Sequence, residues 1–375
     1  MKDFSKDDTK VVKGVAILLM IALHCFAFPD RIGNYDKIIT LPLEIHGETL
    51  LQCVSKFGII CLSIYTFLSG IGMYKQYNLK GEYSVSKRII GFYKEYWKVF
   101  IIFLPIGFLF FRNQNEFCEN SAIYNIFKDV SLEKIIKDFV GMESNYNREW
   151  WFVKTYFFAL ILGYIYMKLL SKCKSFWLEF FAITLITTFY HSIAPNLNQT
   201  IIASGINSDY FFRNFFYVHN CVPLIFMGIV VAKYDILSKI YELLFAKYNK
   251  FFKIIFSVLL IAILIYVRNY CGFIGIDLII VPIFVVCIIN IFKPIKVGYK
   301  ILKVFGENST TMWLVHSFYC YYFGSVQKLL YSLKSDILIF AAIVVLSLVT
   351  SVIIKHFYNI IDKYLLCKFI KEKSN

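Results

Sequence analysis

The first hydrophobic stretch of this 375-residue chain contains two residues suited to chemistry, Lys13 and His24. On a helix that rises about 1.5 Å per residue, their spacing places them about 16 Å apart along the axis, close to the reach of an extended pantetheine arm. A cation at one end suits the phosphates of a coenzyme A thioester, and an imidazole at the other can accept a hydroxyl proton at neutral pH. The opposing interpretation is that His24 bonds a neighbouring helix and that Lys13 only anchors the helix end.

The composition predicts that these residues lie in a membrane. The chain is 58% hydrophobic and 17% charged, whereas a soluble domain carries about 25% charged residues. A spanning helix needs roughly 20 mostly apolar residues. We therefore expect an all-α, polytopic bundle of about ten transmembrane helices, near residues 11–28, 50–74, 97–111, 151–170, 176–191, 215–233, 251–267, 273–292, 310–332 and 336–354.

The basic residues predict how this bundle is oriented. The net charge is +15, and most of the 40 lysines and arginines fall in alternate connections between the apolar segments. Cytoplasmic loops are rich in such residues, so we expect a multi-pass protein of the plasma (inner) membrane with both termini in the cytoplasm. Because the basic tracts are short and separated, they do not predict a nucleic-acid surface. We expect a single domain over residues 1–375 and no metal, since no metal-ligand spacing occurs.

The segment from Val11 to His24 resembles the opening of the acyltransferase-3 family of integral membrane O-acyltransferases. That family opens with a basic residue, a glycine, an apolar run and a histidine eleven positions after the basic residue. Lys13 stands where arginine is usual, which keeps the charge and loses the bidentate phosphate fork. The resemblance implies that His24 is a catalytic base or transient acyl carrier and that Lys13 binds acyl-CoA.

Two later segments extend the resemblance. Residues 64–72 end in Leu-Ser-Gly as in the family, although Ser69 also suits close helix packing. Residues 86–97 resemble its basic segment before the third helix, where Arg88 fits and Gly91 and Lys94 depart. The resemblance implies that Arg88 donates to the phosphates of acyl-CoA, whereas the alternative is an anchor at the cytoplasmic surface.

The long connection at 112–149 is predicted to lie outside the cell and is net acidic. Ser131 to Val140 predicts a short amphipathic helix with a serine cap. Trp150-Trp151-Phe152 resembles the family's Trp-Phe at the same place. We expect Glu149 and Trp151 to line the acceptor entrance, the alternative for the tryptophans being an aromatic belt.

The segment from Phe305 to His316 is the second good match to the family. It implies that His316 orients or polarises the site beside His24. A weaker match includes His219 and Pro223. The resemblance covers residue 11 to about residue 330, with the motifs in the family's order.

The expected function is therefore transfer of an acyl group, expected to be acetyl, from cytoplasmic acetyl-CoA to a hydroxyl of a cell-envelope polysaccharide or glycolipid. The expected partners are acyl-CoA, an envelope glycan or lipid-linked saccharide, and the lipid bilayer. The alternative is a polysaccharide polymerase or glycan transporter. Polymerases usually display arginine-rich outer loops for sugar diphosphates, and the acidic loop at 112–149 disfavours that alternative.

Overall fold

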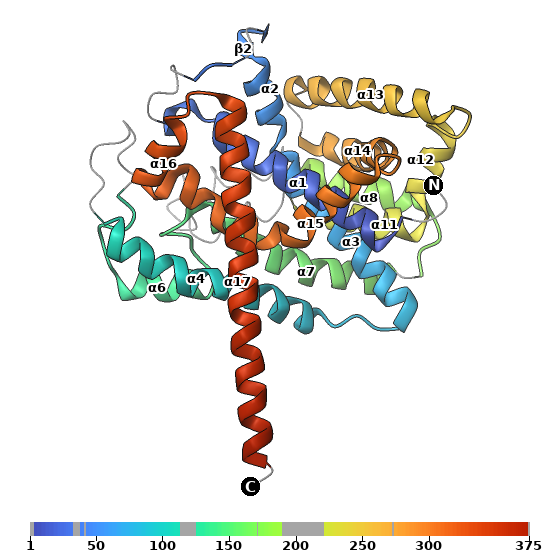
Figure 1. Cartoon of the computed structure of the whole chain (residues 1–375). Coiled ribbons are helices and arrows are strands. Elements are labelled where there is room, and N and C mark those ends of the chain that lie inside the picture. Colours follow the sequence, from blue (N-terminus) through green and yellow to red (C-terminus); the bar gives the residue numbers. More distant parts are fainter. Residues whose placement is uncertain are drawn as a thin grey trace, which may run out of the picture.

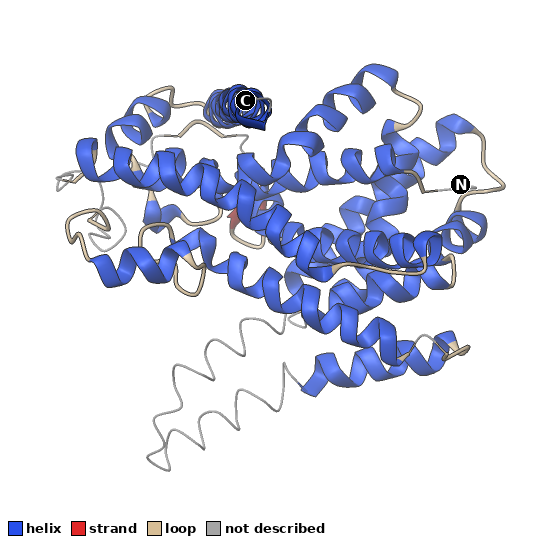
Figure 2. Ribbon diagram, turned by 90° about the horizontal axis from the view of Figure 1, so that it is seen from below, coloured by secondary structure: helices blue, strands red, loops and turns tan. Residues whose placement is uncertain are grey.

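The computed structural model describes residues 4–32, 38–40, 43–112, 125–170, 172–189, 221–271 and 274–373, with side chains described to Tyr364. These parts are almost entirely helical (Figures 1 and 2). The helices are α1 Lys6–Phe26, α2 Leu50–Phe57, α3 Ile60–Lys80, α4 Val85–Phe110, α6 Leu132–Phe139, α7 Phe152–Leu169, α8 Phe176–Thr188, α11 Val222–Lys233, α12 Ile236–Leu244, α13 Lys250–Tyr270, α14 Asp277–Phe292, α15 Lys296–Ser317, α16 Gly324–Tyr331 and α17 Asp336–Lys373.

Five of the described helical segments are long and apolar enough to cross a membrane: Lys6–Phe26, Leu50–Lys80, Arg148–Leu169, Lys250–Tyr270 and Asp336–Tyr364. Shorter apolar helices are α8, α11 and α14. The fold is thus a multi-pass helical bundle, as the sequence predicts. The predicted spans 176–191, 215–233 and 273–292 each lie partly outside the described residues, and His219 lies outside them.

Several helix boundaries differ from the predicted spans because hydropathy marks only the apolar part of a helix. α4 begins at Val85, well before the predicted span at 97, because Ser84 caps it and its first turns carry charged residues. α15 begins at Lys296 and continues unbroken into the apolar stretch predicted to start at 310. Once a helix has formed, each further residue adds a backbone hydrogen bond. A helix can therefore extend beyond its apolar segment where its polar turns contact water or polar neighbours.

α1 and α15 form the centre of the bundle and run side by side in the same direction. The beginning of α1 pairs with the middle of α15, where Lys303 lies 2.7 Å from Asp7 and Glu307 lies 2.8 Å from Lys10. The Ser5 side chain begins α1 by accepting from the Asp8 backbone N–H. The resulting alignment carries the late turns of both helices to the same depth.

Two glycines allow this close contact. A Cβ on Gly14 would lie 2.0 Å from the carbonyl oxygen of Leu302, and one on Gly306 would lie 1.8 Å from that of Lys10. Neither carbonyl belongs to a flexible side chain, so any larger residue must push the helices apart. Small residues at such contacts are typical of membrane helix pairs.

Gly306→Ala is therefore expected to destabilise the protein by about 1–3 kcal/mol, the usual cost of overpacking. Gly72→Ala is the matched control, because a Cβ there meets nothing within 4 Å; alanine in a helix stabilises by up to about 1 kcal/mol. Thermal unfolding of the two purified variants in the same detergent measures the difference. Equal unfolding temperatures would contradict the close contact of α1 with α15.

α13 and α17 lie at the edges of this bundle. Only 11% of the apolar window of α13 is buried. Figure 1 shows α17 running across the direction of most other helices, with its C-terminal part extending beyond them, and Figure 2 looks along its axis. It is held where it crosses α15, since Lys355 donates to the side-chain oxygen of Asn308 at 2.8 Å. The predicted span at 336–354 is thus one part of a helix that continues to Lys373.

The described part of the connection after α4, from residue 125 on, packs along that helix. The predicted amphipathic helix is present as α6, capped by Ser131. Three aromatic side chains of α4 donate to carbonyl oxygens at the C-terminal end of α6: Tyr96 to Asp138, Trp97 to Phe139 and Tyr93 to Val140. This docking fixes the chain that leads into the short 3₁₀ turn Arg148–Trp151 at the start of α7.

Candidate active site

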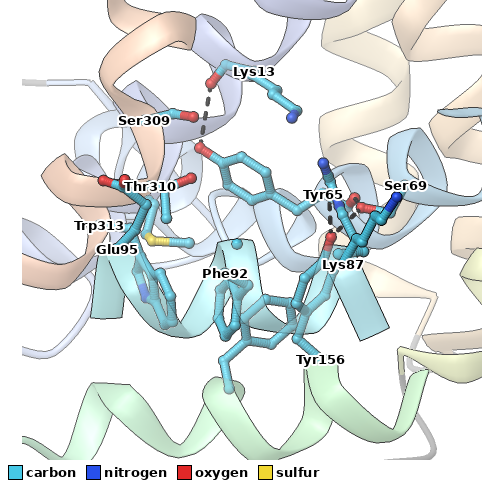
Figure 3. Close-up of a pocket in the computed structure, with 14 residues that line it drawn as sticks. Lys13, Tyr65, Ser69, Lys87, Phe92, Glu95, Tyr156, Ser309, Thr310 and Trp313 are labelled. Atoms are coloured by element: carbon cyan, nitrogen blue, oxygen red, sulfur yellow. Dashed lines mark hydrogen bonds between the residues drawn. The ribbon is translucent and has the colours of Figure 1, made fainter. Parts of the chain in front are cut away.

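A cavity of about 350 Å³ opens between α1, α3, α4, α7 and α15 (Figure 3). One part of its wall is cationic and is formed by Lys13, Lys87 and Arg88. The deeper part is lined by Met20 of α1 and Trp313 of α15. The cavity thus combines a cationic mouth with a mixed lining of aromatic rings, hydroxyl groups and the Glu95 carboxylate. Apolar walls with a few polar groups are common in ligand sites.

The cations of this cavity lack acidic partners. In the part of the chain that the structure describes, neither Lys13 nor Arg88 lies within ion-pair distance of a carboxylate. Arg88 instead donates to the hydroxyl of Tyr156 at 3.3 Å, and this hydroxyl lies 2.9 Å from that of Ser69 (Figure 3). Lys13 is half-buried and Arg88 is exposed at the cavity mouth. Cations that have no carboxylate partner there can form charge-assisted hydrogen bonds to an anionic ligand.

Two histidines lie within one helical turn of the deep end of the cavity. Met20 precedes His24 by four residues, and Trp313 precedes His316 by three. The two imidazole rings have centroids 5.0 Å apart. His316 is fully buried, and its Nδ1 lies 2.6 Å from the carbonyl oxygen of Trp313.

These contacts define the hydrogen bonding of His316. A carbonyl can only accept, so Nδ1 of His316 donates the proton and Nε2 carries the lone pair. No group among the described residues bonds that Nε2. A buried acceptor without a partner costs free energy and is usually explained by a ligand, a water or a catalytic role.

A π-helical turn at Phe318–Tyr322 follows α15 and completes the surroundings of His24. The hydroxyl of Tyr321 donates to the carbonyl oxygen of His24 and lies 3.3 Å from its Nδ1. The next residue, Tyr322, donates to the Glu149 carboxylate. Such turns are frequent at functional sites because the extra residue changes which side chains face inward.

Glu149 links this turn to the beginning of α7. The carboxylate is buried and pairs with Arg31 at 3.4 Å. The backbone N–H of Glu149 donates to the side-chain oxygen of Asn147. The side-chain amide of Asn147 donates in turn to the hydroxyl of Ser317, which follows His316 in the chain. Glu149 and Lys13 therefore lie on opposite sides of the histidine pair.

The structure brings most of the predicted site residues together. Lys13 and Arg88 line one cavity, His24 and His316 lie beside each other, and Glu149 joins them through Tyr322. For the tryptophans the arrangement is different: Trp150 is buried and donates to the Leu314 carbonyl at 3.0 Å, whereas Trp151 is half-buried and packs on Phe152.

Four residues of this site were not predicted from the sequence: Tyr156, Tyr321, Tyr322 and Arg31. The tyrosines carry no signal of their own in a chain with 27 of them. Arg31 had a weak signal, as a basic residue in a connection predicted to be poor in such residues.

The fold and the site together define the class: a multi-pass helical bundle with a basic cavity that leads toward two adjacent histidines. The family model of the acyltransferase-3 domain, described as an acyltransferase domain, matches residues 8–356. The chain therefore belongs to the acyltransferase-3 family and is a membrane acyltransferase, as the motifs at both histidines indicate. No curated protein and no solved structure matches it.

Proposed function

We propose that this protein is an O-acetyltransferase of the plasma membrane, which moves an acetyl group from cytoplasmic acetyl-CoA to a hydroxyl of a cell-envelope polysaccharide or glycolipid. The proposal includes ten spans with both termini in the cytoplasm. One observation carries it: Lys13 and Arg88, without carboxylate partners in the described structure, line a cavity that ends within a turn of two adjacent histidines.

In this proposal the donor enters at the basic end of the cavity. The phosphates of acetyl-CoA bind Lys13 and Arg88, and the pantetheine arm extends past Met20 and Trp313. The spacing of Lys13 and His24, about 16 Å on a helix, matches this arm. The acceptor enters from the opposite end, where Glu149 and Arg31 offer hydrogen bonds to sugar hydroxyls.

The reaction then needs one base. The acceptor oxygen attacks the thioester carbonyl carbon, the carbon–sulfur bond breaks, and an oxygen ester forms. His24 takes the proton of the acceptor hydroxyl and passes it to the departing CoA thiolate. The ring of His316 lies 5.0 Å from that of His24, centroid to centroid, and its Nε2 has no other partner among the described residues. In this proposal His316 orients the His24 imidazole and stabilises its protonated form.

Proteoliposomes that contain the purified full chain test this proposal. They are supplied with acetyl-CoA labelled in the acetyl group and with envelope glycan from cells that lack the protein. We expect base-labile label on glycan hydroxyls and release of free CoA in equal amount. A glycan that grows longer without label, or crosses the membrane without label, would instead support a polymerase or transporter.

A further inference from the structure

A second cavity, of about 290 Å³, lies away from the histidines between α12, α13 and α14. Three lysines contribute to its wall: Lys250 and Lys253 from the first turn of α13, and Lys293 just after α14. Tyr241 of α12 and Asn290 of α14 complete its polar lining, and no acidic residue contributes. The cavity therefore has a strong positive charge.

This charge is only partly neutralised by the protein. Lys293 pairs with Asp8 at 3.2 Å, while Lys253 donates to the hydroxyl of Tyr241 at 2.7 Å. For Lys250 and Lys253, the described residues supply no carboxylate within ion-pair distance. Neither of these two ammonium groups is neutralised by a carboxylate there, so both can bind an anion.

Asn290 provides an independent sign of a ligand. This residue is 8% exposed and lines the cavity, yet its Nδ2 has no hydrogen-bond partner in the described structure. A buried amide donor without a partner is costly, and native proteins usually satisfy such a group with water or a ligand. An oxygen-rich anion in the cavity would accept from this donor and from the lysines together.

The neighbouring surface indicates that this anion carries acyl chains. α13 is the least buried of the long apolar helices, and it exposes Phe251, Phe252 and Leu259 by more than half. Figure 1 shows α13 at the edge of the bundle, next to α12 and α14. Acyl chains can lie on this apolar face while the headgroup phosphate occupies the cavity. The link between Lys293 and Asp8 places the cavity at the same end of the bundle as the mouth formed by Lys13.

We propose that the cavity between α12, α13 and α14 binds the phosphate headgroup of an anionic phospholipid, held by Lys250, Lys253, Lys293 and the Asn290 amide. Basic pockets between membrane helices are suited to such headgroups. The proposal does not depend on the acyl-transfer reaction, because none of these residues lines the cavity near the histidines.

Binding of phosphatidylglycerol to the full chain in neutral detergent, followed by native mass spectrometry, tests this site. Lys250→Gln with Lys253→Gln is expected to weaken phosphatidylglycerol binding about twenty-fivefold, since each lysine near a lipid phosphate contributes about fivefold. The control is Lys80→Gln with Lys300→Gln, which removes two exposed lysines that line none of the cavities described here. Asn290→Leu keeps every charge and is expected to weaken binding several-fold, which general surface attraction would not explain.

Two further ligands complete the experiment. Phosphatidylcholine has no net charge and is expected to bind far more weakly than phosphatidylglycerol. Inorganic phosphate, which lacks acyl chains, is expected to compete only at much higher concentration. The proposal is overturned if phosphatidylcholine binds equally well, if phosphate displaces the lipid at equal concentration, or if the control pair loses as much binding as the lysines of the cavity.

Discussion

Replacing His24 with alanine is expected to lower acetyl transfer by about a thousandfold, because a general base contributes roughly 10²- to 10⁴-fold to such reactions. The KM for acetyl-CoA is expected to change little, since the proposed phosphate contacts lie at the other end of the cavity. Steady-state rates in proteoliposomes with labelled acetyl-CoA measure both quantities. His24 is half-buried, and alanine is smaller than histidine, so the substitution introduces no steric clash.

His356→Ala is the matched control for this experiment, because His356 lies on the exposed surface of α17. It is expected to retain full activity. Both variants must show the unfolding temperature of the unchanged protein, so that lost activity reports chemistry. If the His24 variant folded normally and still transferred acetyl groups at an undiminished rate, the catalytic role of the histidine pair would be wrong.

Removing a charge from the cavity mouth is expected to raise the KM for acetyl-CoA by about 10- to 100-fold, the usual worth of a hydrogen bond to a charged group. Lys13→Gln and Arg88→Gln test this separately. The effect on kcat is expected to be smaller, because neither side chain lies at the histidine pair. Lys13→Arg keeps the charge and adds a bidentate donor, so we expect it to retain or improve donor binding.

A donor without phosphates separates binding from folding. S-acetylpantetheine carries the same thioester and arm, and the unchanged protein is expected to use it poorly. Against this donor the Lys13 and Arg88 variants are expected to equal the unchanged protein. Tyr156→Phe removes the hydroxyl that accepts from Arg88 but leaves both positive charges in place. We therefore expect it to raise the KM for acetyl-CoA less than Lys13→Gln or Arg88→Gln does. Equal losses with both donors would contradict phosphate binding at this mouth.

Along one helix, the sequence determined the geometry of the site. Lys13 and His24 belong to a continuous apolar helix, and a regular rise per residue sets their separation before any packing is known. The membrane class followed equally directly, because a chain with 58% hydrophobic residues needs an apolar surrounding. The start of α6 could also be predicted, because the Ser131 side chain accepts from a backbone N–H only three residues away. Such a cap depends on local sequence and not on the rest of the fold.

Contacts between helices were decided only by the tertiary structure. His316 follows His24 by 292 positions, and their 5.0 Å approach depends on the glycine contacts of α1 with α15. The partner of Arg88 is Tyr156 from α7, and the neighbour of His24 is Tyr321 from a π turn. Hydropathy and spacing describe each segment separately, whereas these pairings depend on which faces of distant helices fit together. The same reason explains why the cavity beside Asn290 has no signature in the sequence.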